Sequence, residues 1–326
     1  MKKKHIYIYS PSGAVRDKAA FKRGVRRLQT LGHEVEIDQH ALSSHQRFAG
    51  DDETRLAAIH RAAASGADVA LISRGGYGLT RILGRIRYKE IAKAFEQGTQ
   101  FVGISDFTAM QLALLAKTGA LSWAGPALCE GFGVGGKPAA NADGTVTAPA
   151  VPDDIMEDCF NDMITGQGEG TGWRQDRIGA SGHAVEHDAA LRVNHASLWG
   201  GNLTIVTSLL GTPYFPEIKG GILFLEDVGE HPYRIERMLT QLLHAGVLAR
   251  QKAIVMGQFT EFKLSSHDKG FKMQAVLQWL RSQTKTPILT NLPYGHVATK
   301  VMLPVGAKVD LVVQGRDALL FWGHQD

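Results

Sequence analysis

The sequence predicts an α/β protein whose N-terminal lobe is a doubly wound (Rossmann-like) parallel sheet, followed by a C-terminal lobe of α/β or α+β type. Short runs rich in β-branched and aromatic residues alternate with amphipathic stretches through the first third of the chain. The run 68–73, DVALIS, is almost continuously apolar, as expected of a strand that is buried on both faces. A segment rich in Gly, Ala and Pro, residues 131–152, then separates this part from a second set of elements.

The elements expected in the N-terminal lobe alternate between strand and helix. Residues 5–9 form a β-rich run that stops at the turn cluster 10–13, and residues 19–31 show helical spacing that Gly32 ends. The same reading gives strand 34–37, helix 53–64, strand 68–73, helix 88–97, strand 100–104 and helix 107–118. This alternation predicts a parallel sheet with helices on both faces.

The second part of the chain is also expected to mix strands and helices, without an internal repeat. Its predicted elements are helix 154–165, strand 221–225, helix 232–245, strand 253–257, helix 272–282 and antiparallel strands within 308–322. We therefore expect an N-terminal α/β lobe over residues 1–130, a linker over 131–152 and a C-terminal lobe over 153–326.

Composition narrows the classes of function. A chain of 326 residues with a formal net charge of +4 has room for two medium domains and lacks the basic stripe of a nucleic-acid-binding protein. Its two cysteines, Cys129 and Cys159, imply no disulfide framework and fit a reducing compartment. No run is long enough for a signal-peptide core or a membrane span. We expect a cytoplasmic protein without nucleic-acid or membrane partners.

The segment 101–107, FVGISDF, is the best candidate for chemistry. A buried apolar run ends on Ser105, and an amphipathic stretch follows at once. A serine at such a strand-to-helix turn is held out at the edge of a sheet, where unpaired N–H groups of the first helical turn can stabilise an oxyanion. The segment lacks the second glycine of G-x-S-x-G, and the alternative is an ordinary helix N-cap. The first interpretation predicts a serine hydrolase.

A serine nucleophile needs a base and an acid. Among the 13 histidines, His296 lies in NLPYGHV, a turn that follows a β-compatible run, although an exposed loop histidine would look the same. Glu226 ends the apolar run GILFLE, where a carboxylate can accept an imidazole N–H, although it could equally be a charged strand end. The order Ser, Glu, His along the chain is compatible with an α/β-hydrolase triad.

Two glycine turns are candidates for binding. In SRGGYG, residues 73–78, adjacent glycines allow close backbone approach, so this turn can supply a second oxyanion donor with Arg74 near a substrate carboxylate. The alternative is a plain tight turn between a strand and a helix. The turn WGGNL, residues 199–203, is similar and could line a cleft.

One motif favours a different chemistry. His183 and His187 stand in HAVEH, which fits the inverted zinc-protease pattern H-x-x-E-H. That chemistry needs both histidines on one helical face and a third ligand elsewhere. The flanking segments read as a turn and an alternating run, so a helix is not expected here. We expect no metal.

Several segments together resemble the serine LD-carboxypeptidases, or muramoyltetrapeptide carboxypeptidases. They are SPSG (10–13), RGGYG (74–78), GISDFTA (103–109), AGPAL (124–128), WGGNL (199–203), GTPY (211–214), LEDVGEHPYRIERML (225–239), YGH (294–296) and LPVGA (303–307). The resemblance spans nearly the whole chain in order and leaves the linker as the main unmatched part. The linker is expanded relative to the family.

The resemblance implies a cytoplasmic hydrolase, usually homodimeric, that needs no cofactor. Family members act in peptidoglycan recycling, removing the terminal D-alanine of murein tetrapeptide at the bond from the L-centre of diaminopimelate. The family's nucleophile, acid and base fall on Ser105, Glu226 and His296. The oxyanion hole would use the backbone N–H of Asp106 and that of Gly75 or Gly76.

The remaining expectations concern the substrate and the alternatives. Arg74 is expected to hold the free carboxylate of the peptide, with Arg192 as a weaker choice, and Tyr77 and Asn202 are further expected substrate contacts. The alternatives are a microcin-C-type peptidase of the same family, a non-catalytic two-lobed binding protein, and the metallopeptidase with His183 and His187.

Overall fold

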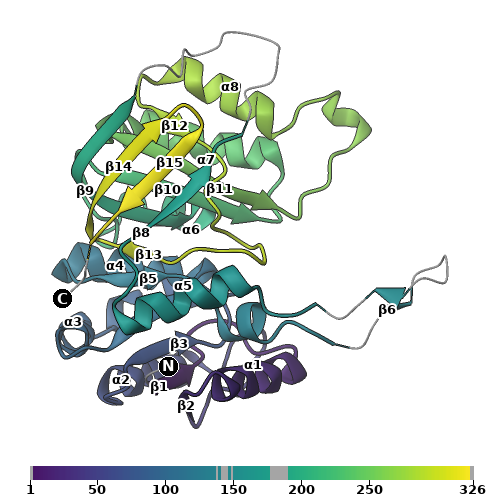
Figure 1. The fold of residues 1–326 in the computed structure, drawn as a ribbon, viewed down its shortest axis with the longest axis vertical. Coiled ribbons are helices and arrows are strands. Elements are labelled where there is room, and N and C mark those ends of the chain that lie inside the picture. Colours follow the sequence, from purple (N-terminus) through teal and green to yellow (C-terminus); the bar gives the residue numbers. More distant parts are fainter. Residues whose placement is uncertain (1–2, 137–138, 141–145, 148–149, 177–189, 324–326) are drawn as a thin grey trace.

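The computed structural model describes the chain apart from residues 1–2, 137–138, 141–145, 148–149, 177–189 and 324–326. Two lobes, each built on one sheet, are stacked along the long axis of the molecule (Figure 1). Most of the N-terminal lobe is drawn in purple and blue, and most of the C-terminal lobe in green and yellow. Within the described ranges, no helix is long and apolar enough to span a membrane.

The sheet of the N-terminal lobe has the doubly wound topology that the sequence predicts. Its strands are β1 (His5–Tyr9), β2 (Glu34–Ile37), β3 (Val69–Ile72), β4 (Gln100–Gly103), β5 (Ser122–Ala124) and β13 (Leu303–Val305), in the order β13-β5-β4-β3-β1-β2. The strands β1 to β5 are parallel, and the strand order reverses between β1 and β3. Ligands bind beside such a reversal, outside the carboxyl ends of the strands.

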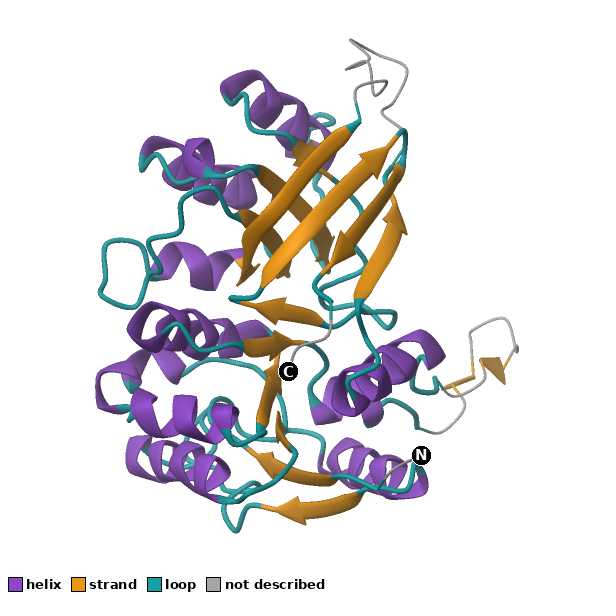
Figure 2. Ribbon diagram, turned by 60° about the vertical axis from the view of Figure 1, so that its left-hand side comes forward, coloured by secondary structure: helices purple, strands orange, loops and turns teal. Residues whose placement is uncertain are grey.

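The helices of this lobe are close to their predicted bounds. They are α1 (Lys18–Thr30), α2 (Asp52–Ala64), α3 (Tyr88–Glu96) and α4 (Thr108–Thr118). The helix α1 begins where the Asp17 carboxylate accepts hydrogen bonds from the N–H groups of Ala19 and Ala20, and α4 ends at Gly119 in the left-handed conformation. Figure 2 shows the strands of this lobe running between helices on either side.

The sheet of the C-terminal lobe is mixed. Its strands are β8 (Gly170–Arg174), β9 (Leu191–Asn202), β10 (Ile222–Val228), β11 (Ala253–Thr260), β12 (Ile288–Leu289), β14 (Lys308–Gln314) and β15 (Asp317–Phe321). The order is β12-β11-β10-β9-β14-β15-β8, with β9 to β12 parallel and the rest antiparallel. The helices are α6 (Leu203–Ser208), α7 (Pro232–His244) and α8 (Met273–Gln283). The predicted α/β architecture with two lobes is confirmed.

Two elements after residue 153 lie on the N-terminal lobe, although the predicted boundaries assign them to the C-terminal one. The helix α5 (Asp154–Thr165) packs there through an ion pair of Arg27 with Glu157 and an edge-to-face contact of Phe132 with Phe160, 5.0 Å between ring centroids. The strand β13 pairs antiparallel with β5 at the waist of the molecule (Figure 1). Long-range pairing of this kind leaves no local trace in the sequence. The boundaries 1–130, 131–152 and 153–326 stay a prediction.

The expected linker contains more structure than its composition indicates. A turn of π-helix, Leu128–Phe132, is almost wholly buried and runs into its first two residues. The short strands β6 (Ala139–Ala140) and β7 (Val146–Thr147) then pair antiparallel and project from the body of the molecule (Figure 1).

Candidate active site

Two glycine turns of the N-terminal lobe, SPSG and SRGGYG, meet the turn at Ser105 at one edge of the N-terminal sheet. The SPSG turn follows β1, the SRGGYG turn follows β3, and Ser105 follows β4, so all three leave the carboxyl ends of neighbouring strands. The N–H of Gly13 donates to the carbonyl of Gly75 at 3.1 Å, which joins the first two turns. This edge includes the point where the strand order reverses.

Ser105 has the backbone geometry of a nucleophile elbow. Its φ is 67°, in the left-handed region that non-glycine residues seldom adopt, and a short 3-10 turn (Ser105–Phe107) leads from it into α4. A Cβ on Gly103 would lie 2.5 Å from the Phe107 ring. Phe107 stands where the motif G-x-S-x-G has its second glycine. Its ring fits there because Gly103, the first glycine of the motif, has no side chain. The elbow forms without that glycine.

Gly75 directly contacts the candidate nucleophile. A Cβ on Gly75 would lie 2.5 Å from Cβ and 2.7 Å from Oγ of Ser105. Gly76 has a φ of 118° and lies against Gly13. Within the described residues, no hydrogen bond of a turn, loop or cap uses the N–H of Gly75 or Gly76. The N–H of Asp106 belongs to the first turn after the elbow, where N–H groups have no intrahelical acceptor. These donors lie where an oxyanion hole is expected, and their role stays a prediction.

The side chain of Asp106 holds the turns together from behind. It is buried, and its Oδ2 accepts hydrogen bonds from the Ser12 hydroxyl and, at 2.9 Å, from the N–H of Leu79. Burial raises the pKa of the Asp106 carboxyl. The hydrogen bonds from Ser12 and from the backbone act to lower this pKa, but burial is the larger effect. This side chain therefore fixes both glycine turns relative to Ser105.

Arg55 is a second internal brace that the sequence reasoning missed. It is completely buried, donates to the carbonyl of Gly78 at 2.8 Å and forms an ion pair with Asp52. Its guanidinium also lies over the ring of Phe48, 4.8 Å from the centroid. Nothing in the sequence distinguishes this arginine from others on amphipathic helices. Only the fold shows that it supports the SRGGYG turn.

The predicted acid and base are in contact in the C-terminal lobe. Oε2 of Glu226 lies 2.8 Å from Nδ1 of His296, and the Glu226 side chain is fully buried. An ionised carboxylate can only accept, so Nδ1 carries the proton and Nε2 is left as an acceptor. Burial acts to lower the pKa of His296, but the hydrogen bond and the charge of Glu226 outweigh it and raise that pKa. Glu226 lies inside β10, which runs on to Val228, rather than at its predicted end.

Asn202 connects the two lobes. Its Nδ2 donates to Glu226 at 3.2 Å and to Asp227 at 3.0 Å, and its Oδ1 accepts from the N–H of Ile205 at the start of α6. Its own N–H donates to Oγ1 of Thr108, the first residue of α4, at 3.1 Å. The buried pair Thr108–Asn202 thus fixes the end of β9 beside the helix that follows Ser105. Within the described residues, no hydrogen bond joins Ser105 to His296.

The side chains expected to contact the substrate differ in their burial and in their hydrogen bonds within the protein. The Arg74 guanidinium donates to the carbonyl of Ala14 at 3.2 Å and to Glu130 at 3.4 Å. Tyr77 is exposed and packs beside Phe48, whereas Asn202 is buried in the contacts given above. Substrate binding by Arg74, Tyr77 and Asn202 stays a prediction. Arg192 is exposed on the antiparallel part of β9, away from the carboxyl ends of the parallel strands.

The metal motif cannot be placed. His183 and His187 lie outside the residues that the structure describes. In the described part of the chain, no three His, Cys, Asp or Glu side chains are grouped as they would be around a metal ion.

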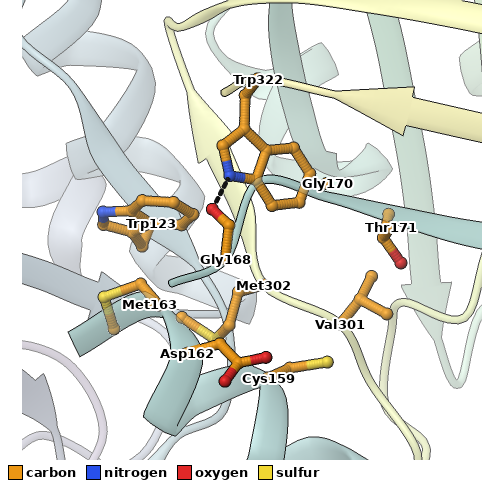
Figure 3. A pocket seen from close by; sticks show the side chains of 10 residues that line it. All are labelled: Trp123, Cys159, Asp162, Met163, Gly168, Gly170, Thr171, Val301, Met302 and Trp322. Carbon is orange, nitrogen blue, oxygen red and sulfur yellow. Dashed lines mark hydrogen bonds between the residues drawn. The ribbon is translucent and has the colours of Figure 1, made fainter. Parts of the chain in front are cut away.

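A separate hollow lies between α5 and the C-terminal lobe (Figure 3). Trp123 and Trp322 line it, with Val301 and Met302 from the loop that follows His296. The indole N–H of Trp322 donates to the carbonyl of Gly168 at 2.7 Å, which closes one side. None of the candidate catalytic residues lines this hollow, which is a packing feature of the waist between the lobes.

The comparisons with known proteins agree with this arrangement. The sequence models of the LD-carboxypeptidase N-terminal domain and C-terminal domain match residues 6–125 and 195–311. The first match contains Ser105 and the glycine turns, and the second contains Glu226 and His296. The family-level resemblance predicted from the motifs is confirmed.

Known proteins of this kind match nearly the whole chain. The solved structure of a muramoyltetrapeptide carboxypeptidase from Oxalobacter formigenes is 37% identical, with a TM-score of 0.80 over 98% of both chains. The murein tetrapeptide carboxypeptidase of Pseudomonas aeruginosa is 25% identical over 86% of this chain and 85% of its own. The microcin C7 self-immunity protein MccF has a TM-score of 0.80 over 99% of this chain and 97% of its own, at 21% identity, which shows a shared fold alone.

Proposed function

The chain belongs to the LD-carboxypeptidase family, and on that basis we propose that it is a serine carboxypeptidase that removes the terminal D-alanine of murein tetrapeptide. The observation that carries the proposal is the pairing of Glu226 with His296 at 2.8 Å, in a lobe that Asn202 fixes against the Ser105 elbow. The 37% identity with a muramoyltetrapeptide carboxypeptidase supports the choice of substrate.

The first step is attack by Ser105. Its Oγ adds to the carbonyl carbon on the L-centre of diaminopimelate while Nε2 of His296 takes the hydroxyl proton. Glu226 holds the imidazole in the tautomer with the proton on Nδ1 and stabilises the imidazolium that forms. The carbonyl oxygen becomes an oxyanion that accepts hydrogen bonds from the N–H groups of Asp106 and of Gly75 or Gly76.

The second step releases D-alanine. The C–N bond of the tetrahedral intermediate breaks, and the imidazolium of His296 gives its proton to the leaving amine. Water then attacks the acyl-enzyme, with His296 again as base, and Ser105 is regenerated. Every proton in this sequence is moved by a group of the chain or by water, so the chemistry needs no cofactor.

The proposal extends to the setting of the enzyme. As members of this family are expected to do, the protein would act in the cytoplasm on peptides recovered during peptidoglycan recycling, and it would do so as a homodimer. Light scattering of the purified protein tests the oligomeric state, and a mass of one chain would contradict the dimer.

Mass spectrometry of murein tetrapeptide incubated with the protein tests the activity. Wild type is expected to convert tetrapeptide to tripeptide and free D-alanine, and Ser105→Ala to leave the peptide intact. Ser282→Ala, at an exposed serine near the end of α8, is the matched control and should retain full activity. Equal turnover by wild type and Ser105→Ala would contradict the proposed nucleophile.

The same preparations distinguish the alternatives. A non-catalytic binding protein would bind the peptide without releasing D-alanine in both forms, and a metallopeptidase would lose its activity in a strong chelator. A microcin-type peptidase would cleave aspartyl sulfamoyl adenosine in preference to murein tetrapeptide.

A further inference from the structure

Lys300 has a buried side chain and no bonded partner among the described residues. Only 3% of its surface is exposed, and it makes no hydrogen bond or ion pair with any residue that the structure describes. It lies in the loop that follows His296, four positions further along the chain. Its Nζ atom is not among the buried side-chain atoms that lack a partner, so the stem of the side chain is buried while the ammonium group reaches solvent.

Charged groups from both halves of the candidate site act electrostatically on Lys300. Glu226 and Glu130 both act electrostatically on its ammonium group, and its charge in turn acts on His296. Glu226 and His296 belong to the C-terminal lobe, whereas Glu130 contacts Arg74 beside the SRGGYG turn of the N-terminal lobe. Charged groups from both halves of the candidate site therefore lie near the ammonium group.

The carboxylates near Lys300 are already bound elsewhere. Glu226 is held by His296 and Asn202, and Glu130 is held by Arg74. Asp153, the third nearby carboxylate, caps α5 and accepts from the hydroxyl of Thr299 at 2.7 Å. None of them accepts a hydrogen bond from Lys300 or forms an ion pair with it, and burial lowers the pKa of its ammonium group.

The backbone holds Lys300 in this position. Thr299 is tied to Asp153, and the N–H of Val301 donates to the carbonyl of Pro293 at 2.9 Å. Val301 and Met302 are inserted in the apolar hollow at the waist (Figure 3). Rotation of the loop would expose these side chains, so the backbone at Lys300 is held in place.

We propose that Lys300 receives a carboxylate group of the substrate in the cleft. The inference rests on the proposed function, because murein tetrapeptide carries free carboxylates at its C-terminal D-alanine and on the side chain of diaminopimelate. A substrate carboxylate would supply the partner that the ammonium group lacks and would be selected over an uncharged group at the same place. Lys300 is then a binding residue and takes no part in proton transfer.

Peptide binding in the Ser105→Ala background tests this separately from turnover. Three ligands are titrated by calorimetry: murein tetrapeptide, its C-terminal amide, and the analogue with lysine in place of diaminopimelate. Lys300→Met is expected to weaken binding of the tetrapeptide by roughly 10- to 100-fold, the size of a charged hydrogen bond, and Lys300→Arg to restore part of it. With Ser105 present, the same variant should raise KM far more than it lowers kcat.

The analogues identify the carboxylate. The peptide that lacks the group bound by Lys300 should bind equally well with and without the Lys300→Met substitution. Lys252→Met, at an exposed lysine, is the control for loss of charge, and thermal melting checks that each variant is folded.

Two results would overturn the proposal: equal affinity of folded Lys300→Met and its parent for all three peptides, or loss of affinity in Arg74→Met alone. Binding without cleavage by the enzyme that retains Ser105 would contradict the proposed function and leave the Lys300 assignment standing. If no peptide binds, both are overturned.

Discussion

Ser105 adopts a φ of 67° because the chain has to change from β4 to α4 within a few residues. Such a conformation costs on the order of 1–3 kcal/mol and persists only where the surroundings enforce it. Here the surroundings are the Phe107 ring against Gly103 on one side and Gly75 on the other. The strained residue and its support are therefore local, and each contact can be tested by adding one methyl group.

Gly75→Ala is expected to lower kcat/KM by about 100-fold or more, because the added Cβ would collide with Cβ of Ser105 and displace the hydroxyl or the oxyanion donor. Steady-state kinetics with thermal melting measures this. Gly168→Ala is the matched control, since its Cβ would meet neighbours only at 3.4 Å or more and its φ is not positive. Full activity of Gly75→Ala would show that this turn does not approach the nucleophile in solution.

Glu226→Gln is expected to lower kcat on the order of 10⁴-fold, as removal of the orienting carboxylate does in other triads. The raised pKa of His296 places the acid limb of the kcat/KM profile above the ordinary histidine value, because the base has to be neutral. Without the carboxylate that pKa falls and the limb moves to lower pH. Profiles of kcat/KM against pH for wild type and Glu226→Gln measure this shift. An acid limb at the same pH in both proteins would show that a group other than His296 titrates there.

The same pKa has a consequence for stability. Because the pKa of His296 is higher in the folded than in the unfolded protein, the pair with Glu226 contributes its full stabilisation below the unfolded value of about 6.5. That contribution is lost as the pH rises through the folded pKa. Denaturant titrations at several pH values should show this loss in wild type and not in Glu226→Gln.

At the level of elements, the two halves of the candidate site are aligned by the end of β9 and the start of α4. The bond from the Asn202 N–H to Thr108 is buried, and Asn202 also caps α6 and holds Glu226. The carboxyl ends of β9 and β10 carry Asn202 and Glu226 as neighbours in register. The positions of the acid and of the nucleophile helix thus depend on one another.

Thr108→Val tests this alignment. The substitution keeps the shape of the side chain and leaves the buried N–H of Asn202 without an acceptor, which should destabilise the protein by about 1–3 kcal/mol. Urea unfolding measures the loss, and kcat should fall together with stability because Glu226 loses its fixed distance from α4. Thr118→Val, at an exposed position near the end of the same helix, should change neither quantity.

Much of this element structure could be predicted from the sequence. The strands at residues 5–9 and 34–37 and the helices α1, α2 and α3 lie within a residue or two of their predicted bounds, because buried runs and helical spacing are local patterns. Strand β10 is longer than predicted because its apolar run ends before the strand does, at the buried carboxylate of Glu226. Periodicity cannot distinguish a buried carboxylate with partners from the exposed end of a strand.

For the whole molecule, the two lobes share structure across the waist. The strand β13 comes from the end of the chain and completes the N-terminal sheet, and α5 packs on the same lobe through Arg27 and Phe132. Separate unfolding of the lobes would break these contacts and expose Trp123 in β5. The lobes are therefore expected to unfold together.

Thermal unfolding should show one transition, with the same midpoint by tryptophan fluorescence and by far-ultraviolet circular dichroism. The fragment 1–152, which lacks α5 and β13, should give no cooperative transition of its own. Two separated transitions in the full chain, or a cooperative fragment, would show that the waist contributes little to stability.

The sequence alone determined the α/β class, most of the elements and the three residues proposed as nucleophile, acid and base. The class and the elements follow from local composition and periodicity, and the three residues follow from short motifs that occur in the family's order along the chain. The tertiary structure decided which lobe receives α5 and β13 and that Asp106 and Arg55 brace the turns SPSG and SRGGYG. It also decided that the side chain of Lys300 is buried with no bonded partner among the described residues. Each of these depends on contacts between residues far apart along the chain, and burial and pairing are properties of such contacts.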